Sequence, residues 1–111
     1  MAITHIVLFQ FKTGLDPADV KKACEEVISL KDTCIHPSSQ RPYIKSFRGG
    51  SDNSPEGAQK GITHALVAEF ETVADRDYYI SADPVHLALN KHLAELVEAF
   101  QVVDFTEGVY A

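Results

Sequence analysis

The sequence predicts a single α+β domain whose elements follow the order β-α-β-β-α-β. A chain of 111 residues fits one domain and leaves no room for a separate nucleotide-binding fold. Its 45% hydrophobic and 23% charged residues are typical of an ordinary globular protein. Segments with an apolar residue at every second position alternate with segments of three- and four-residue spacing, which indicates strands interspersed with helices.

The first half of the chain predicts a strand, a helix and a second strand. Residues 3–12 are rich in β-branched and aromatic types, contain no Gly or Pro, and are largely apolar on both faces, so both faces should be covered. Asp16 and Pro17 provide the N-cap and first-turn proline of an amphipathic helix. Its apolar side consists of Val20, Ala23, Cys24, Val27, Ile28 and Leu30. A loop at 34–42 precedes a strand at 43–48 that we expect to end at Gly49-Gly50, followed by a mobile loop to residue 61.

The second half predicts a strand, two helices and a last strand. Residues 63–70 form the strand, and a capping box from Thr72 to Asp75 opens a short helix through residue 80. Asp83-Pro84 begins a longer helix, which its apolar stripe extends to about residue 100: Val85, Leu89, Leu93, Leu96 and Phe100. The last strand then covers 102–106. This order is ferredoxin-like, with an antiparallel four-stranded sheet and the helices on one face.

A sheet with helices on one face leaves its other face bare. On the first strand that face carries either Ile6 and Leu8 or Val7 and Phe9, and both pairs are too apolar to face water. Two sheets packed face to face across a two-fold axis would bury it. We therefore expect a homodimer formed through the sheet face.

Composition and motifs exclude several classes of function. Sixteen acidic and ten basic residues give a net charge of -6 without a Lys/Arg cluster, so neither nucleic acid nor a membrane is an expected partner. The N-terminus lacks the basic region and cleavage site of a signal peptide. Cys24 and Cys34 have no metal-ligand spacing, and nucleotide-binding motifs are missing. We expect a reduced, cytoplasmic protein with no metal and no cofactor.

Five histidines suggest candidate chemistry. His86 is expected at the edge of the buried stripe, where its imidazole could transfer a proton near neutral pH. Tyr79 lies seven residues earlier across a helix break, so its phenol could share a cavity with His86 and polarise a carbonyl. The competing interpretation is that Tyr79 is a core residue. His5 and His64 lie among apolar strand residues and need hydrogen-bond partners, whereas His36 and His92 should be solvated.

Four segments resemble the stress-responsive A/B barrel domain (Dabb) family across nearly the whole chain. They are the opening strand T-H-I-V-L-F-Q-F-K, G-x-T-H-A at 61–65, F-E-T-V near 70–73 and D-P-V-H at 83–86. The resemblance implies a dimeric α+β barrel of two ferredoxin-like subunits, with the whole chain, 1–111, as one such domain. A plant polyketide cyclase of this family performs an aldol condensation without a cofactor. Its general-base histidine matches His86, its carbonyl-binding tyrosine Tyr79 and its first-strand histidine His5.

The resemblance implies an enzyme of cyclase or lyase type that acts on a small apolar carbonyl compound similar to a polyketide. Because the tyrosine-to-histidine interval is one residue longer than in that cyclase, Tyr78 could replace Tyr79 in the pocket. The expected walls of the pocket are Val7, Phe9, Leu66, Ala68, Tyr78 and Leu89. His64 should lie about 20 Å from His5, at the other end of a strand pair. The family also contains a hydroxynitrile lyase and stress-induced oligomers without known catalysis, so a non-catalytic homo-oligomer is the alternative.

Overall fold

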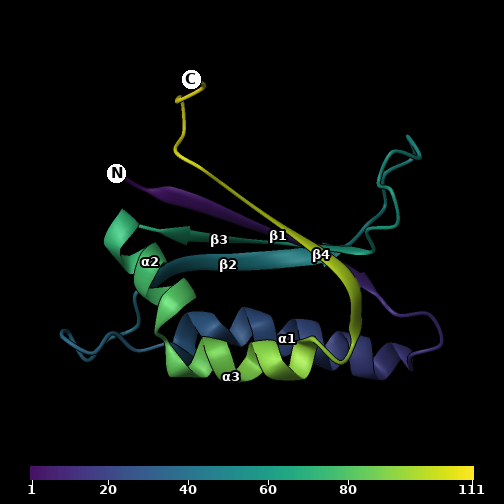
Figure 1. Cartoon of the computed structure of the whole chain (residues 1–111), viewed down its shortest axis with the longest axis horizontal. Helices are drawn as coiled ribbons and strands as arrows, with labels where there is room; N and C mark the ends of the chain where they lie inside the picture. Colours follow the sequence, from purple (N-terminus) through teal and green to yellow (C-terminus); the bar gives the residue numbers. More distant parts are fainter.

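The computed structural model describes all 111 residues and confirms the ferredoxin-like fold. In chain order the elements are β1 (Ile3–Phe11), α1 (Pro17–Thr33), β2 (Ile44–Ser51), β3 (His64–Phe70), α2 (Val73–Ser81), α3 (Pro84–Leu93) and β4 (Val97–Phe105). The four strands form one antiparallel sheet in the order β2-β3-β1-β4. Helices α1 and α3 lie side by side on one face of this sheet, and α2 lies across one end (Figure 1).

Each helix begins where the sequence provides a cap. The side chain of Asp16 accepts a hydrogen bond from the amide of Ala18 at the start of α1, and Thr72 accepts one from Asp75 at the start of α2. Asp83 caps α3 in the same way. Because these caps satisfy amides that have no partner within the helix, they fix the position at which each helix starts.

The prediction that α3 continues to residue 100 was wrong. The helix ends at Leu93, and residues from Val97 onward form β4, which pairs with β1 from Phe11 to Thr4. Phe100 belongs to β4, opposite Phe9, and is 64% exposed. Residues 97–105 suit a strand as well as a helix, and hydrogen bonding to the free edge of β1 decides between them.

Strand β2 also differs from the prediction, because it continues through the glycine pair to Ser51. Gly49 lies against Leu66 of β3, and a Cβ atom at this position would come within 2.5 Å of the Ala65 carbonyl oxygen. Glycine therefore permits close approach of the two strands here. Gly50 has open space around it. The predicted mobile loop begins only after residue 51.

The main core lies between the sheet and the helices. Its buried residues on the sheet include Phe9, Phe11, Phe47, Leu66 and Phe70, and those on the helices include Ala23, Val27, Leu30, Tyr79 and Leu93. Because side chains alternate along a strand, Ile6 and Leu8 lie on the opposite face. The structure thus decides between the two pairs that the sequence left open, and Val7 and Phe9 face the helices.

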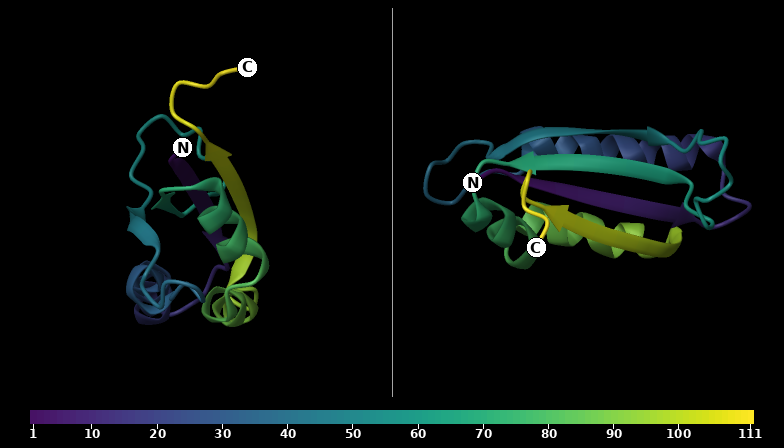
Figure 2. Two further views of the ribbon diagram at one scale, coloured as in Figure 1. Left: turned by 90° about the vertical axis from the view of Figure 1, so that its left-hand side faces the viewer. Right: turned by 90° about the horizontal axis from the view of Figure 1, so that it is seen from above.

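We call the sheet surface away from the helices the outer face. The strand register places these apolar residues on it: Ile6, Leu8, Ala65, Val67, Val103 and Phe105. Val103 is 53% and Phe105 43% exposed in the single chain. In Figure 2 the C-terminal segment leaves the body on this same side of the sheet. Such a continuous apolar surface is typical of an interface.

None of the helices has the length and apolarity needed to cross a bilayer.

Candidate active site

A cavity of about 440 Å³ lies between the sheet and the helices, on the side of β4. Twelve of its 15 lining residues are hydrophobic, and none is Lys, Arg, Asp or Glu. Its polar side chains are His5 from β1, Tyr79 from α2, and His86 and Asn90 from α3. A mostly apolar cavity with a few convergent polar groups is typical of a small-molecule site.

The break between α2 and α3 brings Tyr79 and His86 together. The His86 ring stacks on the Tyr79 ring with centroids 3.7 Å apart and an angle of 15° between the planes. His86 Nδ1 lies 2.7 Å from the main-chain oxygen of Tyr79. Because a carbonyl oxygen can only accept, Nδ1 carries the hydrogen, and the neutral ring has its lone pair on Nε2. Nε2 is therefore the basic atom available at the cavity.

Burial keeps both rings in the protonation states that proton abstraction requires. It lowers the pKa of His86, and the nearby His5 lowers it further, while the hydrogen bond to the Tyr79 carbonyl and Asp83 act in the opposite direction. The imidazole is therefore neutral at pH 7. Burial, with Cys34 and Asp83, raises the pKa of the Tyr79 phenol, which stays protonated. The site thus pairs an uncharged base with a hydroxyl donor.

The Tyr79 hydroxyl is free to bind a ligand. Its side chain is 2% exposed, and no residue of the chain forms a hydrogen bond with the hydroxyl. No fully buried side-chain nitrogen or oxygen atom lacks a partner, so the hydroxyl oxygen reaches open space, which for this residue is the cavity. A carbonyl oxygen in the cavity would supply the missing acceptor.

Asn90 contacts the basic atom of His86. It lies one helical turn further along α3, and its Nδ2 is 3.1 Å from His86 Nε2. The amide donates to the neutral imidazole; after proton uptake, rotation of the amide would present its oxygen to the new N–H. Because the amide occupies the single lone pair of Nε2, this hydrogen bond must break when Nε2 takes a proton from a substrate.

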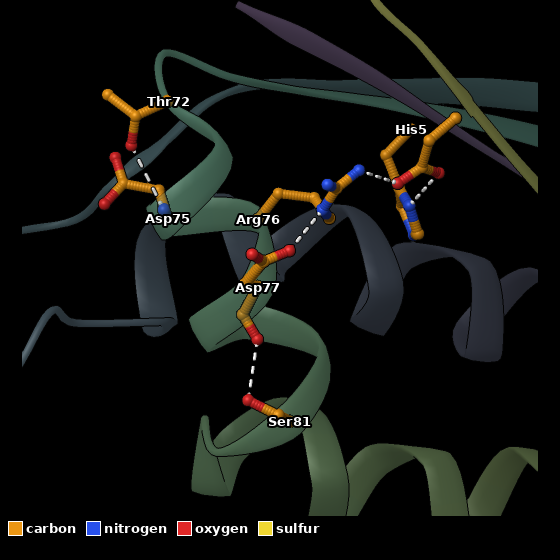
Figure 3. Close-up of polar contacts among 7 residues, drawn as sticks. His5, Thr72, Asp75, Arg76, Asp77 and Ser81 are labelled. Atoms are coloured by element: carbon orange, nitrogen blue, oxygen red, sulfur yellow. Dashed lines mark hydrogen bonds and ion pairs between the residues drawn. The ribbon is translucent and has the colours of Figure 1, made fainter.

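A contact with the neighbouring strand fixes the orientation of the His5 ring. The residue is 4% exposed, and its Nδ1 lies 2.6 Å from Oδ1 of Asp104 on β4. Arg76 of α2 donates through Nη1 to the other oxygen of Asp104 at 2.8 Å and through Nε to Asp77 at 2.7 Å (Figure 3). With Nδ1 donating to the carboxylate, the Nε2 atom of His5 is left for the cavity, and the ring stands edge-on to Tyr79 at 5.8 Å.

A buried polar group supports the helix that carries His86. Asp83 is 1% exposed and accepts hydrogen bonds from the amides of Val85 and His86 and, at 2.5 Å, from the Tyr43 hydroxyl. Burial and the neighbouring Asp83 carboxylate raise the pKa of the Cys34 thiol to about 12, and the same causes raise that of Tyr43. Cys34 is accordingly a protonated, inert thiol.

The predicted site residues divide into two groups. His86, Tyr79, His5, Val7 and Phe9 line the cavity together. The other predicted wall residues lie elsewhere: Leu66, Ala68, Tyr78 and Leu89. Leu66 and Ala68 are covered by core packing, because the cavity opens toward β4 rather than toward β3. Tyr78 points the other way, where its ring packs with those of His36 and Tyr43. His36 is thus half-buried rather than solvated, and His92 is exposed.

His64 lies in a different part of the molecule from the cavity. It pairs with Phe9, four residues along β1 from His5, which corresponds to about 13 Å rather than the expected 20 Å. Its ring packs edge-on against Phe11 and lines a separate groove between α1 and β2. No group of three or more His, Cys, Asp or Glu side chains is arranged to hold a metal ion.

Sequence reasoning missed Arg76, Asn90 and Asp104 as parts of the site. The four-residue spacing of Asn90 from His86 on a helix was an available signal for that contact. The Asp104–His5 contact spans 99 residues and depends on the register of β4 with β1, which the sequence analysis did not predict.

The fold and the cavity together define a small ferredoxin-like α+β protein with a mostly apolar pocket that presents imidazole and phenol groups. The model of the Stress responsive A/B Barrel Domain family matches residues 3–107. The chain therefore belongs to this family, as the resemblance predicted.

The chain is also similar to one curated protein and to several solved structures. The chain is 23% identical over 107 residues to olivetolic acid cyclase of Cannabis sativa, covering 96% of this chain and 97% of that protein. A solved structure of an Arabidopsis thaliana protein is 25% identical, with a TM-score of 0.83 and 98% of each chain covered. The structure of hydroxynitrile lyase from Passiflora edulis is 22% identical, with a TM-score of 0.80, and the match covers 99% of this chain and 97% of the lyase chain. Several other solved structures that resemble this chain are described as dimeric.

Proposed function

We propose that this protein is a cofactor-independent enzyme of cyclase or lyase type that acts on a small, uncharged carbonyl compound such as a polyketide. The observation that carries this proposal is the stacked Tyr79–His86 pair at the wall of an apolar cavity. A cavity without Lys, Arg, Asp or Glu has no partner for a carboxylate or phosphate, which favours an uncharged substrate.

The proposed mechanism uses one base and one hydrogen-bond donor. His86 Nε2 removes a proton from a carbon next to the carbonyl, while the Tyr79 hydroxyl donates to the carbonyl oxygen, where negative charge develops. In a cyclisation, the resulting carbanion attacks a second carbonyl carbon of the same molecule to form a C–C bond. The proton held on His86 then returns to the new alkoxide. His5 Nε2 offers an acceptor for a substrate hydroxyl at the same end of the cavity.

The relatives are consistent with this class of reaction. One is named a cyclase and another a hydroxynitrile lyase. These names do not identify the substrate of this chain, because a shared fold supports different reactions.

The test is conversion of a panel of uncharged poly-β-ketones, followed by mass spectrometry and NMR. We expect the wild-type protein to convert at least one compound, and His86→Gln to abolish conversion while the far-ultraviolet circular dichroism spectrum stays unchanged. His92→Gln is the matched control, because His92 is an exposed histidine on the same helix. Equal activity of His86→Gln and His92→Gln would contradict the assigned base.

The alternative is a non-catalytic stress-responsive homo-oligomer whose histidines are structural. It predicts that His86→Gln lowers the melting temperature strongly and that no member of the panel binds. Ligand-induced shifts of the His86 ring signals would exclude it.

We also propose that the chain forms a homodimer through the outer face. The exposed apolar residues Val103 and Phe105 support this arrangement, as do the relatives described as dimeric. Light scattering should give twice the mass of the chain at micromolar concentration. Phe105→Asp should shift the protein toward monomer, because it would bury a carboxylate at the interface. A monomeric wild-type protein would contradict the proposal.

A further inference from the structure

Arg76 is the one permanently positive side chain that is linked by polar contacts to the cavity lining, and the link runs through another residue. Its guanidinium does not line the cavity; it pairs with Asp104, which in turn holds the Nδ1 atom of His5. The three side chains come from α2, β4 and β1, and the two successive contacts measure 2.8 and 2.6 Å (Figure 3). The side chains are largely buried, with 21%, 18% and 5% of their surfaces exposed for Arg76, Asp104 and His5.

We propose that Arg76 is a positioning residue of the proposed reaction: it neutralises Asp104 so that His5 stays uncharged, with its Nε2 lone pair toward the cavity. An isolated carboxylate 2.6 Å from an imidazole favours a second proton on the ring. A guanidinium on the other oxygen of the same carboxylate opposes that effect, because its positive charge repels an imidazolium. The hydrogen bond to Nδ1 is kept in either case.

The charge on His5 matters because two imidazoles share one cavity. A positive charge on His5 would disfavour proton uptake by His86, because two positively charged rings in one cavity repel each other. It would also replace the acceptor at His5 Nε2 by a donor. Arg76 therefore preserves the basicity of His86 from a distance, and this role rests on the proposed function.

Other charged and titratable groups face His5 as well. Asp104 of β4 contacts the ring, Tyr79 of α2 stands edge-on to it, and His86 of α3 lines the same cavity. Arg76 of α2 reaches the ring only through Asp104, and Asp77 lies beyond Arg76. Of these, only Arg76 adds a permanent positive charge. Its removal should therefore change the charge of His5 in one direction only, toward protonation.

The experiment is ¹⁵N NMR of the histidine side chains in the intact protein at a pH of about 7.5. In the wild type we expect His5 to be protonated on Nδ1 alone. In Arg76→Met the ratio of doubly to singly protonated His5 should rise about tenfold, because this variant removes a nearby positive charge that disfavours protonation of the ring. Arg76→Lys, which keeps the positive charge, should stay within about threefold of the wild type.

Asp77→Asn is the matched control on the other side of Arg76. Asp77 is 62% exposed and contacts the guanidinium but not His5, so this variant should not raise the protonated fraction. If Arg76 only tied α2 to β4, Arg76→Met would lower the melting temperature and leave the ratio unchanged. That result would overturn the proposal. If Arg76→Met does not fold, the same measurement on Arg76→Gln decides.

A second measurement separates this proposal from the proposed function. With a substrate from the panel, Arg76→Met should lower kcat several-fold with little change in KM, because it weakens the base and leaves the cavity wall intact. The NMR ratio needs no substrate. An unchanged ratio overturns the role of Arg76 even if His86→Gln is inactive, and an active His86→Gln overturns the proposed base whatever the ratio.

Discussion

Replacing Asp83 by alanine should destabilise the protein far more than removal of an ordinary helix cap. Asp83 caps α3 through the amides of Val85 and His86, and it accepts the Tyr43 hydroxyl at 2.5 Å. Asp16 of α1 provides the matched control, because it also caps a helix but is exposed and accepts a single bond from Ala18.

The magnitude follows from these contacts. Loss of a cap costs about 1 kcal/mol, and this cost applies to both variants. Asp83→Ala also leaves the Tyr43 hydroxyl without its acceptor in a part-buried site, which adds about 1–3 kcal/mol. The expected total of about 2–4 kcal/mol corresponds to a fall in melting temperature of about 10–20 °C for a domain of this size. Asp16→Ala should lose about 1 kcal/mol.

Urea unfolding followed by circular dichroism, at a fixed protein concentration, measures these differences. Adding Tyr43→Phe to Asp83→Ala should recover about 1 kcal/mol, because it removes the unsatisfied hydroxyl. Equal losses for Asp83→Ala and Asp16→Ala would refute the reasoning. So would a double variant that is less stable than Asp83→Ala.

Three further predictions concern the site and the sheet. Tyr79→Phe should lower turnover about 10²–10³-fold but change the unfolding free energy by less than about 0.5 kcal/mol, because the lost hydroxyl bonds no residue of the chain; kinetics and melting curves check both. Because burial lowers the pKa of His86, the unfolded chain binds more protons than the folded one below pH 6.5, so stability should fall as the pH drops through that range; His86→Gln should flatten this slope in urea titrations. Gly49→Ala should destabilise by about 1–3 kcal/mol and Gly50→Ala by much less, since only the first meets backbone atoms; calorimetry of both variants would reveal a reversed order.

Local signals in the sequence were sufficient for most of the fold. Asp16-Pro17, Thr72 and Asp83-Pro84 satisfy helix amides within a few residues, so their effect does not depend on distant contacts. The boundary between α3 and β4 could not be derived in this way. Its apolar residues fit both periods, and pairing with β1 across about 90 residues determines the outcome.

The candidate site shows the same division. Tyr79 and His86 are seven residues apart, and a predictable helix break brings them together. Asp104 reaches His5 only through the register of β4, and Arg76 reaches Asp104 from α2. The cavity wall depends on how far α3 stands from β4, which is a property of the packed molecule rather than of any segment.

Deuterium incorporation tests most directly whether His86 removes a proton from carbon. An uncharged diketone of the panel would be incubated in D₂O, and exchange next to the carbonyl would be followed by proton NMR above the rate in buffer alone. We predict exchange that rises with pH through the His86 titration, is lost in His86→Gln and is kept in His92→Gln. Exchange at the same rate in wild type and His86→Gln, or no exchange with any diketone that binds, would contradict the central claim.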